Sequence, residues 1–193
     1  LVCCLDSTSP TRTDELQEVL DNCTEPKLLI DHHLTPDIDA VLSISHPEMS
    51  STSELVFDII RQLDGYEAMT EQTAVCIYCG MMTDTGGFTY NSTRPEIFYI
   101  ISQLLAKGID KIYNKVYHTL STSCMKLRSY VIYHKMHVVE KLHASYFTIT
   151  KGEMRRFRFM KGDAEGLVNE PLRIKGMKLS ISLREDTERP NLI

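Results

Sequence analysis

The stretch Leu-Leu-Ile-Asp-His-His at residues 28–33 decides the fold of this chain. Its apolar half is typical of a buried strand in a parallel sheet, and it stops at one carboxylate, Asp31, and two imidazoles, His32 and His33. Parallel strands deliver their last residues to the carboxyl edge of the sheet, where open α/β sheets bind ligands. The sequence therefore predicts that these three side chains project into a crevice at that edge.

Two further acidic residues follow apolar segments. Asp6 closes the apolar run 1–5, and Asp84 lies in the segment 83–88, directly after a predicted apolar helix over 70–82. The alternative interpretation is a polar strand end with two surface histidines. It is less favoured here because three elements, and not one, end in polar side chains: those at Asp6, at Asp31 and at Asp84. Carboxylates and imidazoles without a nearby thiolate favour Mn²⁺ or Mg²⁺ over Zn²⁺.

The first thirty residues have the pattern of a strand, a helix and a second strand. We expect strands at 1–5 and 27–31, with a helix from Thr13, as N-cap, to about Asn22 between them. The right-handed crossover of such a unit places both strand ends, and so Asp6 and Asp31, at the same edge of the sheet. The expected fold class is α/β.

The rest of the chain alternates between helical and strand-like patterns. The segment from Ser121 to Leu142 holds no glycine or proline and is predicted as one long helix connecting two lobes, the second of which begins near residue 144. The other expected elements are a strand at 41–45, helices at 54–63, 70–82, 95–106 and 109–118, and strands at 145–150 and 178–183.

Composition restricts the partners of the protein. The net charge of -5 argues against a surface that grips long duplex nucleic acid, since such surfaces are basic. The six cysteines show no disulfide pattern and are interpreted as reduced core residues. No apolar run approaches the roughly 20 residues that a membrane helix needs, and no signal peptide pattern is present, so the sequence predicts a cytoplasmic protein.

Two further groups of residues have more than one interpretation. The segment 155–161, Arg-Arg-Phe-Arg-Phe-Met-Lys, interleaves cations with aromatic rings as proteins that bind single strands do, although such runs are more often the solvated edge of a helix or strand. The histidines of the connecting region lie at no ligand spacing and are predicted to be surface or packing residues; they are His118, His134, His137 and His143.

The polar element ends resemble the motifs of a known family. Asp6, the triplet Asp31-His32-His33 and the segment 83–88 match, in order and spacing, motifs two to four of the DHH phosphoesterase superfamily. With the downstream segment 162–169, Gly-Asp-Ala-Glu-Gly-Leu-Val-Asn, they resemble the oligoribonuclease and phosphoadenosine-phosphate phosphatase subgroup, often called nano-RNases. The resemblance covers essentially the whole chain.

This resemblance implies an α/β fold of two parts. A parallel-sheet DHH domain would span 1–118, a long helix 119–143, and an incomplete α/β domain for substrate binding 144–193. The family's earlier metal motif, a histidine with two aspartates, is not in the sequence, nor is its later glycine-rich motif that ends in histidine. The chain is therefore expected to be a fragment with an incomplete metal site.

The resemblance also implies a reaction and a division of roles. The complete protein would use two divalent ions, Mn²⁺ by expectation and Mg²⁺ as a possibility, to hydrolyse short oligoribonucleotides or 3'-phosphoadenosine-5'-phosphate. Asp6 would bridge the two ions, and His32 and Asp84 would complete the second. In catalysis Asp31 would orient a histidine, and His33 would face the phosphate. Because neighbouring residues at a strand end point in different directions, the two histidines are expected to diverge and not to ligate one ion together unless the strand bends.

Other functions remain open at this point. On the same fold, a cyclic or linear dinucleotide phosphodiesterase is the leading alternative, and a RecJ-like exonuclease is disfavoured by the acidic balance. A non-catalytic nucleotide-binding module is the alternative from another class. The expected partner is a short nucleotide substrate, with neither long duplex nucleic acid nor membrane, and the resemblance allows a homodimer.

Overall fold

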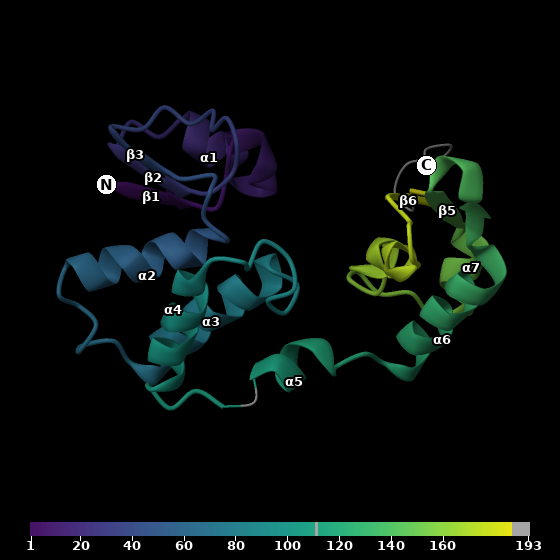
Figure 1. Cartoon of the computed structure of the whole chain (residues 1–193). Helices are drawn as coiled ribbons and strands as arrows, with labels where there is room; N and C mark the ends of the chain where they lie inside the picture. The colour runs from purple at the N-terminus through teal and green to yellow at the C-terminus, as the bar shows by residue number, and fades with distance from the viewer. Residues whose placement is uncertain (111, 187–193) are drawn as a thin grey trace. The chain divides into compact units, whose positions relative to one another are not determined.

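The computed structural model describes residues 1–110 and 112–186 (Figure 1). They form two compact units, and the chain passes from the first to the second between Val116 and Tyr117. No helix in these ranges combines the length and the apolar composition that a membrane crossing requires. The mixed α/β class expected from the sequence is confirmed, whereas the predicted boundaries at 118 and 143 stay a prediction.

The first unit is built on a parallel sheet of three strands in the order β1-β2-β3. All three are short apolar runs: β1 is Val2–Leu5, β2 is Lys27–Asp31 and β3 is Leu42–Ser45. The amide of Asp6 continues the ladder by donating to the Ile30 carbonyl at 3.1 Å. The ends of β1 and β2 therefore lie side by side, as the predicted crossover requires.

The connection from β1 to β2 is more broken than the single helix predicted over 13–22. It contains two 3-10 turns, Pro10–Arg12 and Asp14–Leu16, and then the five-residue helix α1, Gln17–Asp21. Thr13 is not the N-cap of α1, because its hydroxyl donates to the Pro10 carbonyl at 2.6 Å. That contact closes the first 3-10 turn, of which Thr13 is the C-cap.

Helices α2, Thr52–Gln62, and α3, Glu71–Asp84, pack against each other below the strand ends (Figure 1). Hydroxyl side chains start both helices, since Ser51 accepts from the Glu54 amide and Thr70 from the Thr73 amide. The two helices approach closely at Gly80. A Cβ there would lie 2.0 Å from the Ser53 hydroxyl oxygen, so this position excludes any side chain.

The first unit ends with two more helices. Helix α4, Pro95–Leu105, begins at proline as expected and buries Ile97, Ile100 and Leu104. Helix α5 spans Ile112–Tyr117, and the boundary between the two units falls before its last residue.

The second unit has its own sheet and its own core. Strand β5, Ala144–Ile149, pairs antiparallel with β4, His137–Val139, and parallel with β6, Leu179–Arg184. Leu127, Val131 and Phe147 belong to one buried cluster beside this sheet. The remaining elements are α6, Thr122–Tyr130, a π-helical turn at Val131–Lys135, 3-10 turns at Glu140–Leu142 and Leu167–Arg173, and α7, Lys151–Arg156.

The long helix predicted from 121 to 142 is wrong in its second half. Helical structure stops at Lys135, and the next residues pair with β5 as strand β4. The β-branched residues Val138 and Val139 suit a strand, and the partner that selects it lies further along the chain. Because Leu127 and Val131 are buried against Phe147, the helical part belongs to the core of the second unit.

Glu153 joins three parts of the second unit. It forms a capping box with Thr150, and its Oε1 accepts from Tyr130 Oη at 2.9 Å and from Lys135 Nζ at 2.8 Å. Burial by itself would raise the pKa of Glu153, but these hydrogen bonds and those from Thr150 lower it from the usual 4.5 to about 2. The charged carboxylate is therefore the form that the fold stabilises.

We expect the Glu153→Gln variant to lose stability in a pH-dependent way. The folded pKa lies below the unfolded one, so the contribution is complete above about pH 4.5 and fades as pH falls toward 2. Its size is on the order of 3 kcal/mol. Urea unfolding monitored on the second unit should show a large difference between wild type and variant at pH 7 and a smaller one at pH 3. A difference independent of pH would contradict this account.

Candidate metal centre

Asp6 stands at the centre of a polar cluster beyond the strand ends. Its backbone adopts the left-handed conformation, with φ of 56°, which aspartate tolerates better than most residues. This turn follows the last ladder bond of β1. The carboxylate is half exposed, and its Oδ1 accepts a hydrogen bond of 2.8 Å from Thr52 Oγ1 at the start of α2.

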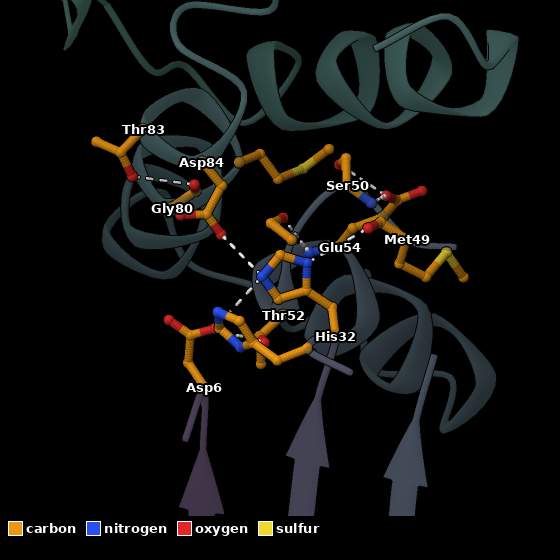
Figure 2. Close-up of polar contacts among 12 residues, drawn as sticks. Asp6, His32, Met49, Ser50, Thr52, Glu54, Gly80, Thr83 and Asp84 are labelled. Atoms are coloured by element: carbon orange, nitrogen blue, oxygen red, sulfur yellow. Dashed lines mark hydrogen bonds and ion pairs between the residues drawn. The ribbon is translucent and has the colours of Figure 1, made fainter. Parts of the chain in front are cut away.

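His32 lies between two carboxylates (Figure 2). Its Nε2 is 3.7 Å from Asp6 Oδ1 and 3.7 Å from Asp84 Oδ2. The other ring nitrogen, Nδ1, is 3.4 Å from the Met49 carbonyl, which can only accept. Because a carbonyl can only accept, this contact orients the ring with Nδ1–H toward Met49 and Nε2 toward the carboxylates, the orientation in which a histidine can ligate a metal through Nε2.

Asp31 is fully buried, and one of its oxygens organises the turn after β2. Oδ1 accepts from the amides of His32 and His33, at 2.9 and 3.2 Å, and contacts His33 Nδ1 at 2.7 Å. Among the described residues, Asp31 Oδ2 has no hydrogen-bond partner. The charge-assisted contact fixes the His33 ring with Nδ1 toward Asp31. The other ring nitrogen, Nε2, takes no part in this contact.

The expectation that the two histidines diverge is wrong. Their ring centroids are 4.5 Å apart, and His33 Nδ1 also lies 3.8 Å from Asp6 Oδ1. The alternation of a strand does not apply, because β2 ends at Asp31 and the chain turns at once. The turn held by the Asp31 carboxylate brings both rings to the same side, next to Asp6.

Asp84 reaches the cluster from the last residue of α3, and its side chain is about one third exposed. Burial raises the pKa of Asp84 above its usual range, and the nearby charge of Asp6 raises it further, whereas His32 and His33 lower it. Two neighbouring carboxylates of this kind are stabilised by a cation between them.

The donor set fits a divalent metal ion. Ligand atoms of Asp6, His32 and His33 all lie within 4.8 Å of one another, and Asp84 adds a second carboxylate on the other side of His32. Ligands that each lie about 2.1 Å from one ion are about 3–4 Å apart, which agrees with the two separations of 3.7 Å at His32 Nε2. Oxygen and imidazole donors without sulfur are those of a hard or borderline divalent cation.

A second layer of polar residues supports this centre and was missed by the sequence analysis. Glu54 is fully buried on α2; its Oε2 accepts from the amide and hydroxyl of Ser50, and its Oε1 accepts from Arg94 Nη2. Arg94 also donates from Nη1 to the Glu48 carbonyl at 3.2 Å. These bonds hold the loop at residues 48–50, which carries the Met49 carbonyl that faces His32.

Only part of this layer had a signal in the sequence. The cluster 50–53 predicts a helix cap, and Ser51 is that cap. In the sequence, Glu54 is an acidic residue in the first turn of a helix, which is ordinary, and Arg94 is simply the residue before Pro95. Neither position indicates a buried ion pair. Their pairing across 40 positions has no local signature.

Comparisons with known proteins relate the part of the chain that holds this cluster to a family. Residues 1–81, which hold Asp6, Asp31, His32 and His33, match the model of the DHH family, N-terminal domain. A Streptococcus mutans protein named probable bifunctional oligoribonuclease and PAP phosphatase NrnA is 26% identical over 175 residues, 90% of this chain. A Thermus thermophilus protein, named bifunctional oligoribonuclease and PAP phosphatase NrnA, is 35% identical over 80 residues, 42% of this chain and 24% of that protein.

A solved structure is similar over nearly the whole chain. The crystal structure of an exopolyphosphatase-related protein from Bacteroides fragilis is 49% identical, with a TM-score of 0.92, and the match covers 96% of this chain. The chain spans 54% of the Streptococcus protein and 55% of the Bacteroides chain, so it corresponds to about half the length of either.

Proposed function

Since residues 1–81 of this chain belong to the DHH family, we propose that the protein is a divalent-metal-dependent phosphoesterase that hydrolyses short nucleotides. One observation carries the proposal. His32 Nε2 lies 3.7 Å from a carboxylate oxygen of Asp6 and 3.7 Å from one of Asp84, with its proton held on the opposite nitrogen by the Met49 carbonyl. Three element ends thus present carboxylate and imidazole donors to one point.

In this proposal Asp6, His32 and Asp84 would hold metal, Mn²⁺ or Mg²⁺, and by the family resemblance Asp6 would be shared between two such ions. Bound ions would activate a coordinated water and neutralise charge on the phosphate oxygens. Thr52 supports this role of Asp6, since its hydroxyl restrains the Oδ1 that both histidines approach. The raised pKa of Asp84 also favours a cation here, because bound positive charge stabilises its ionised form.

His33 has a different proposed role. Asp31 occupies Nδ1 of its ring at 2.7 Å, which leaves Nε2 as the ring atom available to a bound phosphate. His33 Nε2–H can then donate to a phosphate oxygen as negative charge develops there. Asp31 acts through His33 by orienting it.

The substrates follow from the relatives rather than from the site alone. The Streptococcus and Thermus proteins are named for oligoribonuclease and PAP phosphatase activity, and we assign short oligoribonucleotides and 3'-phosphoadenosine-5'-phosphate to this protein. The net charge of -5 supports small substrates over long nucleic acid. The Bacteroides structure is described as exopolyphosphatase-related, so polyphosphate belongs among the tested compounds.

We expect the purified full-length protein, in Mn²⁺, to hydrolyse dinucleotides and phosphoadenosine phosphate. Excess chelator should reduce the rate at least about 100-fold, since the donors described here act only with an ion. Cyclic dinucleotides, long single strands and inorganic polyphosphate complete the panel. Full activity in chelator would refute the metal-dependent mechanism, and preferential hydrolysis of polyphosphate would refute the nucleotide assignment.

A further inference from the structure

The second unit carries an open pocket of about 440 Å³ that the metal centre does not use. It lies where α6, the π-helical turn and the end of α7 come together, and every residue that lines it follows Tyr117. Aromatic and cationic side chains dominate its walls, which include Lys126, Tyr130, Tyr133, His134, Arg156 and Phe157.

The aromatic part of the pocket is partly open to solvent. Tyr133 is 84% exposed, and its ring meets His134 edge-on at 4.7 Å. The Tyr130 ring contacts the rings of His134 and Phe157, at centroid distances of 5.3 and 5.1 Å. The π-helical turn that presents Tyr133 and His134 is a rare element that is frequent at functional sites. An accessible ring on a packed aromatic base is a surface on which a nucleobase can stack.

The cationic part lies beside the rings. The Arg156 guanidinium is 5.5 Å from the Tyr130 ring centre and 5.3 Å from that of Phe157, and Lys126 adds a second exposed cation. Glu153, the acid bonded to Tyr130, has both oxygens engaged, by Tyr130 and Lys135 at Oε1 and by Thr150 at Oε2. Its charge is therefore balanced locally, and the pocket presents net positive charge to a ligand.

We propose that this pocket binds a nucleoside monophosphate, or one nucleotide of a short single strand, with the base stacked on Tyr133 and the phosphate held by Arg156 and Lys126. This inference rests on the proposed function, which it deepens by giving the protein a nucleotide site outside the metal centre. It also gives a role to the cationic and aromatic segment 155–161, of which Arg156 and Phe157 line the pocket. The interleaving of the two residue types is the pattern that stacking and phosphate contact require together.

The sequence contains no tryptophan, so a Tyr133→Trp variant of the chain carries a single fluorescent reporter in the pocket. Titration with AMP in excess EDTA should quench it saturably. Adenosine, which lacks the phosphate, and inorganic phosphate, which lacks the base, should each bind at least about tenfold more weakly, since stacking and charge both contribute. Absence of saturable quenching, or phosphate competing as well as AMP, would overturn the proposal.

Matched variants locate the site. Arg156→Ala in the reporter background should weaken AMP binding about tenfold or more, whereas Arg155→Ala, which removes an exposed cation beside the pocket but outside its walls, should not. Calorimetry on the chain with native Tyr133 and with Tyr133→Ala guards against an effect of the reporter, and equal affinities there would overturn the stacking role.

The metal centre provides the remaining control. Asp84→Asn should leave AMP binding in EDTA unchanged, because the pocket shares no residue with that centre. Loss of binding in this variant would show that AMP occupies the metal centre instead. A protein that binds AMP here but hydrolyses nothing would refute the proposed function and leave this site standing.

Discussion

The His32→Ala variant of the full-length protein should lose metal and activity together. The structure gives this imidazole two carboxylate neighbours at 3.7 Å and a proton fixed on the far nitrogen, which is the arrangement of a metal ligand. Since loss of groups that only support a ligand typically costs about 10–100-fold in metal affinity or activity, loss of the ligand itself should exceed about 100-fold. Metal content after dialysis and kcat at saturating Mn²⁺ measure the two effects.

His33→Ala separates binding from chemistry. Because Asp31 holds the Nδ1 side of His33, we expect this variant to retain metal and to lose about 100- to 1,000-fold in kcat through loss of charge stabilisation at the phosphate. His137→Ala, an exposed histidine of the second unit stacked on Tyr146, is the control and should change neither quantity. Equal metal loss in the His32 and His33 variants would show that the two roles are assigned wrongly.

Arg94→Ala is expected to have the largest effect on stability. It leaves the fully buried Glu54 carboxylate without its cation, and breaking a buried pair in this way costs about 3–5 kcal/mol. Glu54 keeps its two bonds to Ser50, so unfolding in urea should shift strongly while the unit still folds. The released loop at 48–50 should also weaken metal binding through the Met49 carbonyl.

Two comparisons test the cause of that loss. Adding Glu54→Gln to Arg94→Ala removes the stranded charge and should recover part of the stability, which a double-mutant cycle measures as coupling. Arg61→Ala breaks an exposed pair with Asp58, 3.3 Å long, and should cost less than about 1 kcal/mol. If Arg94→Ala costs no more than Arg61→Ala, the buried pair does not stabilise the fold.

The parts of the fold that the sequence predicted are those with strong local patterns. Strand β2 occupies the apolar run that ends at Asp31, and α3 runs from its hydroxyl cap at Thr70 to Asp84. Periodicity and capping depend on neighbouring residues, so they can be interpreted without knowledge of the tertiary structure. The parallel pairing of β1 with β2 followed from the spacing of a crossover unit.

The errors arose where distant partners decide the structure. Strand β4 exists because β5 lies beside it, which the helix-compatible sequence around His137 does not reveal. The orientation of His33 depends on a side-chain contact with Asp31 that overrides strand alternation. Glu54 and Arg94 are each unremarkable alone and become a buried pair only when α2 and the start of α4 are brought together.

The close approach at Gly80 limits how this protein can evolve. The backbone of α3 lies so near Ser53 that even a methyl group would collide with its hydroxyl oxygen, at 2.0 Å. A change at one of the two positions therefore requires a change at the other, and a homologue with alanine at 80 should carry glycine at 53 or a wider spacing between the two helices. Helix α2 carries Thr52, and helix α3 carries Asp84. A substitution at position 53 or 80 that separates the two helices would therefore displace two residues of the metal centre. Selection for the chemistry thus acts on Ser53 and Gly80, although neither takes part in it.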